Sequence, residues 1–217
     1  MSKIIAIMLL LCCGMMLFGC ADDNGRRKAE QQKTIVVTDS VGRKVELPYP
    51  LERVAVCNVH NAELITAVGA IDKIVGVDNY IFKDQSGFKN RFNEAQVFGI
   101  SQNAMNYEKL AELAPQAVII TGEGTWRDAQ EMLDRFGIKV IVINSYYTDQ
   151  FADNCRLIGR IFGREEQAEE LVNYFNDKLA YIQKQLQGVP RRSLYFEYRT
   201  LGKTAVPGDY FYKMVEY

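Results

Sequence analysis

Four short apolar runs separated by helical patterns constrain the fold of this chain more than any other feature. The runs occupy residues 53–56, 74–77, 117–120 and 139–143, and β-branched side chains dominate them. Strands that are apolar along their whole length have both faces covered, as in parallel sheets whose crossovers are helices. The sequence therefore predicts an α/β fold with an N-terminal lobe built on a parallel sheet.

The helices between these strands have recognisable start signals. Asn61 and Asn106 are placed to cap the first two, and Gly69 is placed to end the first. Thr125 and Asp128 resemble the capping box of a third helix. We therefore expect α-helices to begin at these three positions.

Two further segments of the predicted lobe differ from this pattern. Residues 34–47 alternate polar and β-branched side chains around a Ser-Val-Gly turn, which is typical of a hairpin. Residues 78–106 have no clear periodicity and are predicted to be a long irregular connection.

A long amphipathic helix is expected after the lobe. A helix around residues 150–162 precedes it, and apolar side chains then recur at steps of three and four over 164–187. Twenty-odd helical residues make a rod of roughly 35 Å, which outreaches one small lobe. Residues 193–198 resemble the first strand of whatever lies beyond, so the rod is expected to bridge two lobes.

The N-terminus has the pattern of a lipoprotein signal. Lys3 precedes an apolar run over residues 4–18, which is too short for a comfortable membrane span but suits a signal-peptide core. Small Gly19 before Cys20 fits a processing site at which the thiol is acylated, although bulky Phe18 departs from the usual pattern. The alternative is an ordinary signal peptide or membrane anchor with an incidental cysteine.

Composition and cysteine content narrow the classes of function. Lys and Arg number 26 against 27 Asp and Glu, a net charge of −1, so a basic surface for nucleic acid is not expected. Cys57 and Cys155 remain after signal removal, and they either pair or stay as buried free thiols. No G-x-G-x-x-G, P-loop or Gly-x-Ser-x-Gly pattern follows a strand, which argues against an enzyme.

Several segments together resemble the Fe³⁺-siderophore and vitamin B12 periplasmic-binding family. They are TIVVTDSVGRKVELPYPLERVAV from residue 34, MNYEKL with LAPQAVII over 105–120, and GIKV at 137–140. The resemblance runs from about residue 34 to the end. It implies two α/β lobes joined by one rigid helix, with ligand held between them. Such proteins are longer, so the second lobe is expected to be incomplete here.

This resemblance organises the chain into five parts. They are a signal peptide at 1–20, a flexible polar tether at 21–33, an N-terminal α/β lobe at 34–147, a helical segment with the interlobe helix at 148–188, and the start of a C-terminal lobe at 189–217.

Ligands of open α/β sheets bind beyond the carboxyl ends of the strands. In the first lobe these ends carry the predicted ligand contacts Asn58, His60, Tyr80, Lys83, Trp126, Arg127, Tyr146 and Tyr147. Asn61, Asn79, Phe82, Glu123 and Ser145 lie in the same segments. Tyr198 and Arg199 are predicted to face them from the second lobe. Aromatic faces with one or two cations suit a bulky, partly apolar, anionic chelate.

Most of these residues also have an ordinary structural explanation. His60 is the only histidine and could be a helix cap or surface residue, since metal sites need several donors. Trp126 could equally pack in the core, and Arg127 could be a surface residue. We therefore predict no metal site and no cofactor.

Glu108 suggests a contact with a partner protein. It stands in the first turn of its helix, where the helix dipole favours a carboxylate. The family resemblance implies a second role, in which a glutamate at this position projects from the lobe and pairs with arginines of the permease.

The resulting functional hypothesis is a monomeric substrate-binding lipoprotein of an ABC importer. It would sit on the cell membrane, facing the periplasm or the exterior, and bring an iron-siderophore-type chelate to a permease and its ATPase. Corrinoid or haem are alternative cargoes, and His60 or Tyr80 could supply an axial ligand to haem. A truncated lipoprotein with a sensory or structural role is the alternative from another class.

Overall fold

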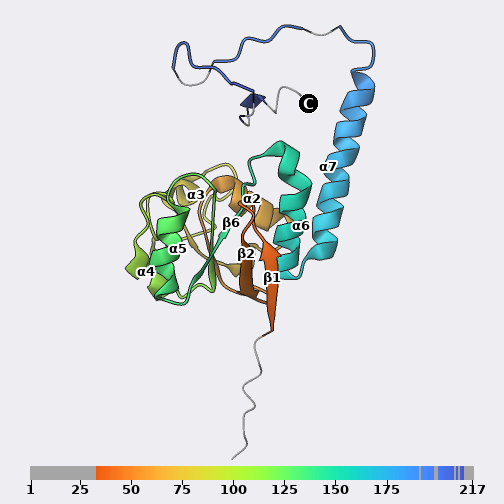
Figure 1. Cartoon of the computed structure of the whole chain (residues 1–217). Coiled ribbons are helices and arrows are strands. Elements are labelled where there is room, and N and C mark those ends of the chain that lie inside the picture. Colours follow the sequence, from red (N-terminus) through yellow and green to blue (C-terminus); the bar gives the residue numbers. More distant parts are fainter. Residues whose placement is uncertain (1–32, 191, 198–199, 208, 210, 213–217) are drawn as a thin grey trace, which may run out of the picture. The chain divides into compact units, whose positions relative to one another are not determined.

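The computed structural model describes residues 33–190, 192–197, 200–207, 209 and 211–212 (Figure 1). The predicted lipidation site Cys20 and the predicted contacts Tyr198 and Arg199 lie outside the described residues, as do the signal peptide and nearly all of the tether.

The predicted parallel sheet is present. Its strands are β3 (Val54–Val56), β4 (Ile74–Val77), β5 (Ala117–Ile120) and β6 (Lys139–Val142), in the spatial order β4-β3-β5-β6. All three neighbouring pairs are parallel. Every residue of β3 and β5 is buried, which is why these strands have no polar alternation.

Helices cover both faces of the sheet, and alternate strand residues enter two separate cores. On one face, Val56 and Ile141 pack with α2 (Val59–Ala67) and α6 (Phe151–Phe162). On the other, Ala55 and Val118 pack with α4 (Tyr107–Leu113) and α5 (Trp126–Asp134). Cys155 lies in the first core and Cys57 in the second, and both are buried free thiols.

The predicted hairpin is β1 (Thr34–Thr38) and β2 (Lys44–Pro48), paired antiparallel from Thr34↔Pro48 to Thr38↔Lys44. Its tip lies along β6, the last strand of the parallel sheet. Ser40 N donates to Val142 O at 2.9 Å, and Asp39 Oδ2 accepts from Val142 N at 3.2 Å. Arg43 Nη2 donates to Val140 O at 3.1 Å. The hairpin tip thereby satisfies backbone groups that an edge strand would leave open.

Helix α2 begins three residues earlier than predicted. Its N-cap is Asn58, whose Oδ1 accepts from His60 N at 2.9 Å. Asn61 lies inside the helix, fully buried, and donates from Nδ2 to Cys57 O at 3.2 Å. The earlier start requires Asn58 at φ 77°, and Asp78 Oδ2 stabilises this backbone by accepting from Asn58 N at 3.0 Å.

The capping prediction is confirmed for α4 and wrong for α5. Asn106 accepts from Lys109 N at 2.9 Å, as expected for an N-cap. Thr125 precedes α5, but its side chain makes no capping hydrogen bond. Its hydroxyl lies 3.2 Å from Asn103 Oδ1 and 3.4 Å from Gln102 O, so it donates to a neighbouring loop, and its oxygen does not accept from the α5 backbone as a capping box requires.

Residues 78–106 are more regular than predicted. They contain the short helix α3 (Asn79–Lys83), which Asp78 caps by accepting from Ile81 N at 3.0 Å, and the 3₁₀ turn η2 (Glu94–Gln96). Phe98 N donates to Val77 O at 3.1 Å, so the chain then runs beside β4. These contacts hold the loop that follows against the sheet.

The predicted rod is α7 (Glu165–Gln185), 21 residues and therefore roughly 32 Å long. It lies side by side with α6 (Figure 1). A Cβ on Gly159 of α6 would lie 2.5 Å from Ala168 Cβ and 2.9 Å from Arg164 O, so glycine permits the close approach. Ala168 and Val172 are buried, whereas Ile182 is half exposed, so the apolar stripe of α7 continues past the lobe.

The strand predicted at 193–198 is absent from its described part, because residues 193–197 have no paired neighbour. Within the described residues, each helix is too short or too polar to cross a lipid bilayer.

Candidate ligand-binding site

An open pocket of about 430 Å³ lies at the carboxyl ends of β3, β4 and β5. Each strand is followed directly by residues of the pocket wall, which is where ligands bind in open α/β sheets. Ten residues line it: Asn58, Val59, His60, Asp78, Tyr80, Ser101, Gln102, Asn103, Thr121 and Glu123. The structure therefore brings together the predicted contacts Asn58, His60 and Tyr80.

Asp78 is the buried centre of this pocket wall, with only 2% of its surface exposed. One carboxylate oxygen accepts from Asn58 N and the other from Ile81 N, both at 3.0 Å. Burial raises the pKa of Asp78, and hydrogen bonds from backbone amides oppose that shift. Asp78 thus couples the start of α2 to the start of α3.

His60 and Tyr80 form the exposed rim. Tyr80 is 63% exposed, and the His60 side chain is 57% exposed. His60 Nδ1 lies 3.1 Å from Glu63 Oε2 on the next turn of α2. This contact orients the ring and leaves its Nε2 edge available to a ligand.

Gln102 forms a wall that the sequence pattern did not reveal. Its Oε1 accepts from Thr121 N at 3.0 Å and from Thr121 Oγ1 at 2.8 Å, and its Nε2 donates to Glu123 O. Ser101 and Asn103 line the pocket beside it. One available signal is Gly99, because a Cβ there would collide with the backbone of Ala104 and the loop must therefore fold tightly.

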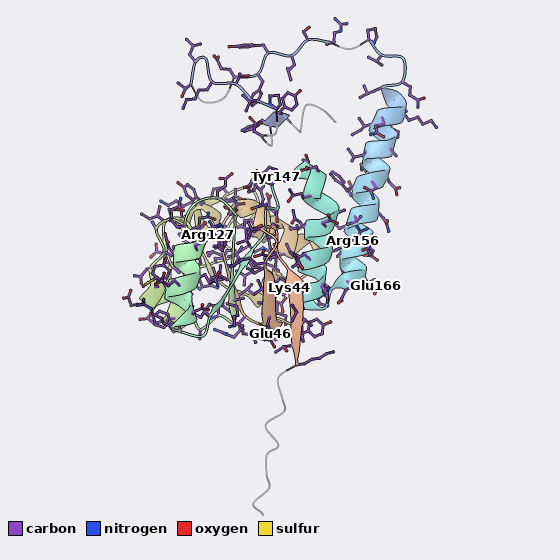
Figure 2. The ribbon with its side chains drawn as sticks, in the orientation of Figure 1. Lys44, Glu46, Arg127, Tyr147, Arg156 and Glu166 are labelled. Carbon is purple, nitrogen blue, oxygen red and sulfur yellow. The ribbon has the colours of Figure 1, made fainter. Side chains whose placement is uncertain are left out.

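Glu123 is held at both ends. Gln102 binds its backbone carbonyl, and Tyr146 Oη donates to its Oε1 at 3.0 Å. Burial, followed by the hydrogen bond to Glu123, raises the pKa of Tyr146 well above that of an ordinary tyrosine. The Tyr146 and Tyr147 rings lie 4.7 Å apart, and Tyr147 sits at the end of the lobe away from Glu46 (Figure 2). Tyr146 thus reaches the pocket through Glu123.

Trp126 and Arg127 do not line the pocket. Trp126 is 8% exposed and packs in the second core, with the guanidinium groups of Arg43 and Arg127 over its ring at 4.3 and 4.1 Å. The packing alternative therefore describes Trp126 better than ligand contact does. Arg127 (Figure 2) is engaged with the indole, and Lys83, the last residue of α3, also lies outside the lining.

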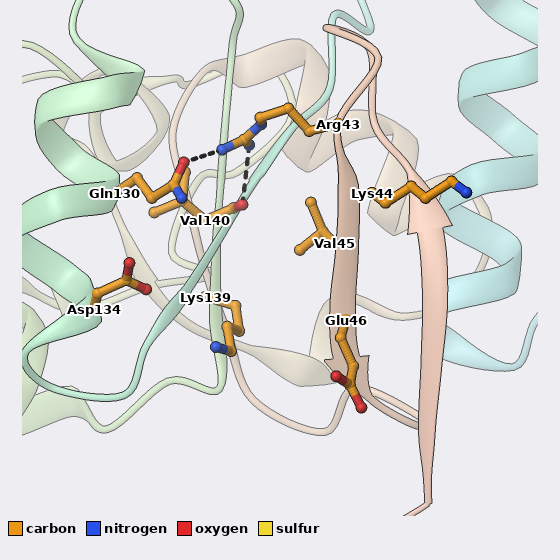
Figure 3. Close-up of a pocket in the computed structure, with 8 residues that line it drawn as sticks. All are labelled: Arg43, Lys44, Val45, Glu46, Gln130, Asp134, Lys139 and Val140. Atoms are coloured by element: carbon orange, nitrogen blue, oxygen red, sulfur yellow. Dashed lines mark hydrogen bonds between the residues drawn. The ribbon is translucent and has the colours of Figure 1, made fainter.

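A second hollow of about 230 Å³ lies between the hairpin and α5 (Figure 3). Arg43 occupies its wall, donating to Gln130 and to Val140 O. The Arg43 guanidinium makes these contacts and also donates to Asp39. We therefore interpret this hollow as part of the packing between hairpin and sheet.

Two further features concern metal binding and docking to a partner protein. The described residues contain no group of three or more His, Cys, Asp or Glu side chains placed to hold a metal ion.

Glu108 is exposed in the first turn of α4 and makes no ion pair with another described residue, whereas Glu112 on the same helix pairs with Lys109 at 3.2 Å.

The fold is matched by known proteins. Residues 54–213 match the family model of the periplasmic binding proteins. The chain belongs to the periplasmic binding protein family. Its members are binding proteins rather than enzymes, and membership implies an extracytoplasmic location. A comparison with curated protein sequences gave no match.

Three solved structures illustrate the likeness. A periplasmic solute-binding protein of Veillonella parvula is 28% identical, with a TM-score of 0.60 over 73% of this chain and 50% of its own. The petrobactin-binding protein YclQ of Bacillus subtilis is 18% identical, with a TM-score of 0.61 over 71% and 54%. Staphylococcus aureus SirA, solved with staphyloferrin B, is 20% identical, with a TM-score of 0.59 over 71% and 51%. The chain spans about half the length of these proteins.

Proposed function

We propose that this chain is a substrate-binding lipoprotein of an ABC importer that captures an iron-siderophore-type metal chelate and delivers it to a membrane permease. The observation that carries the proposal is the open pocket at the carboxyl edge of the sheet, in a lobe of the periplasmic binding protein family. The structural neighbours YclQ and SirA, which bind petrobactin and staphyloferrin B, support the choice of cargo.

Asn58, His60 and Tyr80 are the contacts we propose from this lobe, because they line the pocket. Tyr146 acts on the pocket through Glu123. Tyr147, Lys83, Trp126 and Arg127 have weaker support, since they stand outside the lining. Tyr198 and Arg199 remain proposed contacts from the second lobe. Acylation of Cys20 would anchor the protein to the membrane, and Glu108 would meet the permease.

A chelate panel tests this function. Tyrosine and tryptophan fluorescence of the chain is titrated with ferric siderophores, cobalamin and haem, and ferric siderophores are expected to quench it saturably. Tyr80→Ala should weaken that binding about tenfold or more, because an aromatic face at the pocket rim is lost. Tyr174→Ala is the matched control, since Tyr174 is 61% exposed on α7. Absence of a response to every siderophore would overturn the proposed cargo.

Haem is the second candidate because the histidine and tyrosine that could ligate its iron lie on one rim. Haem binding through His60 would give a Soret band that His60→Ala shifts or removes. A Soret band unchanged in that variant and in Tyr80→Ala would exclude axial ligation by these two residues.

A further inference from the structure

The charge of the pocket is opposite to the one expected for an anionic cargo. Asp78 and Glu123 are acidic, and none of the ten described lining residues is Lys or Arg. The remaining polar lining side chains are the amides, hydroxyls and imidazole of Asn58, Tyr80, Ser101, Gln102, Asn103, Thr121 and His60. This lobe therefore offers hydrogen bonds without a compensating positive charge.

The two arginines beside Trp126 are committed elsewhere. Arg127 lies over the Trp126 ring at 4.1 Å, and Arg43 lies over the same ring while it pairs with Asp39. Moving either guanidinium to a ligand would break a cation–π contact with a buried indole. Lys83 is exposed at the end of α3, outside the lining.

Glu123 is the charged group of the pocket wall best placed to meet a ligand. Asp78 is 2% exposed and spends both carboxylate oxygens on backbone amides. Glu123 is exposed, with its backbone fixed by Gln102 and its Oε1 fixed by Tyr146. A carboxylate held in this way keeps its position when a ligand displaces water, and its field strengthens as the site is desolvated.

Resting on the proposed function, we propose that this lobe selects neutral or cationic metal chelates over anionic ones, and that Glu123, positioned by Gln102 and Tyr146, is the specificity-determining residue. The charge of a ferric chelate follows from its donor groups. Three hydroxamates carry one negative charge each and neutralise Fe³⁺, whereas three catecholates carry two each and leave a net charge of −3. The favoured class is therefore the ferric trishydroxamate, with or without a pendant ammonium group.

The test compares three ferric chelates by fluorescence titration of the chain: a neutral trishydroxamate, a trishydroxamate with a pendant ammonium group, and a tris-catecholate. The first two should bind more tightly than the third. Glu123→Gln should reduce the preference for the cationic over the trianionic chelate by about tenfold, the size expected for one carboxylate in a partly solvated site. Glu131→Gln is the control, because Glu131 is an exposed acid on α5 outside the pocket lining.

Tyr146→Phe separates charge from position. This substitution keeps the Glu123 carboxylate and removes the hydroxyl that holds it. The preference for the cationic over the trianionic chelate should therefore fall less than it does in Glu123→Gln. Binding of the tris-catecholate as tightly as the neutral chelate, or a preference unchanged by Glu123→Gln, would overturn the inference while the proposed function stands. Absence of binding by every chelate would instead overturn the proposed function, and this inference with it.

Discussion

Arg43 Nη2 lies 2.6 Å from Asp39 Oδ2, and the same guanidinium covers the indole of Trp126 at 4.3 Å. The Asp39 side chain is completely buried. It also accepts hydrogen bonds from the backbone of Val41, Arg43 and Val142. One ion pair therefore joins the hairpin, the last strand of the sheet and helix α5.

Arg43→Ala is expected to lower the free energy of unfolding by about 3 kcal/mol, because a buried carboxylate loses its partner. Urea denaturation followed by circular dichroism measures this change. Arg91→Ala is the control, since Arg91 is exposed and its replacement should cost no more than about 0.5 kcal/mol. Equal effects of the two substitutions would contradict the role assigned to the ion pair.

Gly159→Ala tests the contact between α6 and α7, because the sign of the resulting change in stability depends on that contact. Helix propensity alone predicts a gain of about 1 kcal/mol, whereas the new Cβ would meet Ala168 Cβ and Arg164 O. We expect the contact to dominate and the thermal midpoint to fall, by the equivalent of about 1–3 kcal/mol.

The substitution Ala168→Gly is the matched test of that contact. In the Gly159→Ala background it removes one of the two colliding groups. Ala168→Gly should therefore lower the stability less in that background than in the wild-type chain. A thermal midpoint that rises on Gly159→Ala would show that the helices can separate without penalty.

The pH dependence of stability should reveal Asp78. Burial raises its pKa in the folded state, so the folded chain binds a proton more readily than the unfolded chain. The stability that Asp78 contributes is complete below the pKa of an ordinary aspartate and is lost as pH rises through the raised folded-state pKa. The free energies of unfolding of wild type and Asp78→Asn are measured from pH 3 to about pH 7. The variant should become more stable relative to wild type as pH rises.

A constant difference between Asp78→Asn and wild type across that range would contradict the raised pKa. Asp84→Asn is a useful comparison, because hydrogen bonds from Ser86 lower the pKa of Asp84. Its contribution is present at higher pH and is lost as pH falls through the folded-state pKa, so the trend has the opposite sign.

Glu108→Ala should abolish chelate uptake in cells that carry the permease, while chelate affinity stays unchanged. Glu108 is exposed on α4 and lies outside the pocket lining, so its loss removes a docking charge rather than a ligand contact. Glu112→Ala, on the same helix, is the control and should transport normally. Weakened chelate binding with intact uptake in Glu108→Ala would refute the docking role.

Local sequence was sufficient to predict the sheet and the long helix. Residues 117–120 are apolar throughout because both faces of β5 are buried, and the spacing of Ala168 and Val172 reflects the side of α7 that packs on the lobe. Such patterns arise from burial within one element, which periodicity records directly.

The start of α2 could not be predicted in the same way. Asn58 and Asn61 are both acceptable caps in local terms, and Asp78, twenty residues later, decides between them by accepting the Asn58 amide. Thr125 likewise donates to a loop more than twenty residues away instead of capping α5. Choices of this kind depend on contacts that local sequence does not contain.

The candidate site was predictable in location but less so in composition. Its position follows from the strand ends, whereas the Gln102 wall depends on how residues 97–106 fold back on β4. Trp126 and Arg127 were predicted as contacts because they follow a strand, but Trp126 packs in the second core and the exposed Arg127 places its guanidinium over the Trp126 ring.

The hairpin tip that covers β6 also bears on how the protein is made. Residues 39–43 leave the ribosome about a hundred residues before the strand edge they cover. The hairpin tip that covers this edge is thus already synthesised when β6 emerges, and another nascent chain has little opportunity to pair with β6. The order of these segments along the chain is thus itself a protection against aggregation during synthesis.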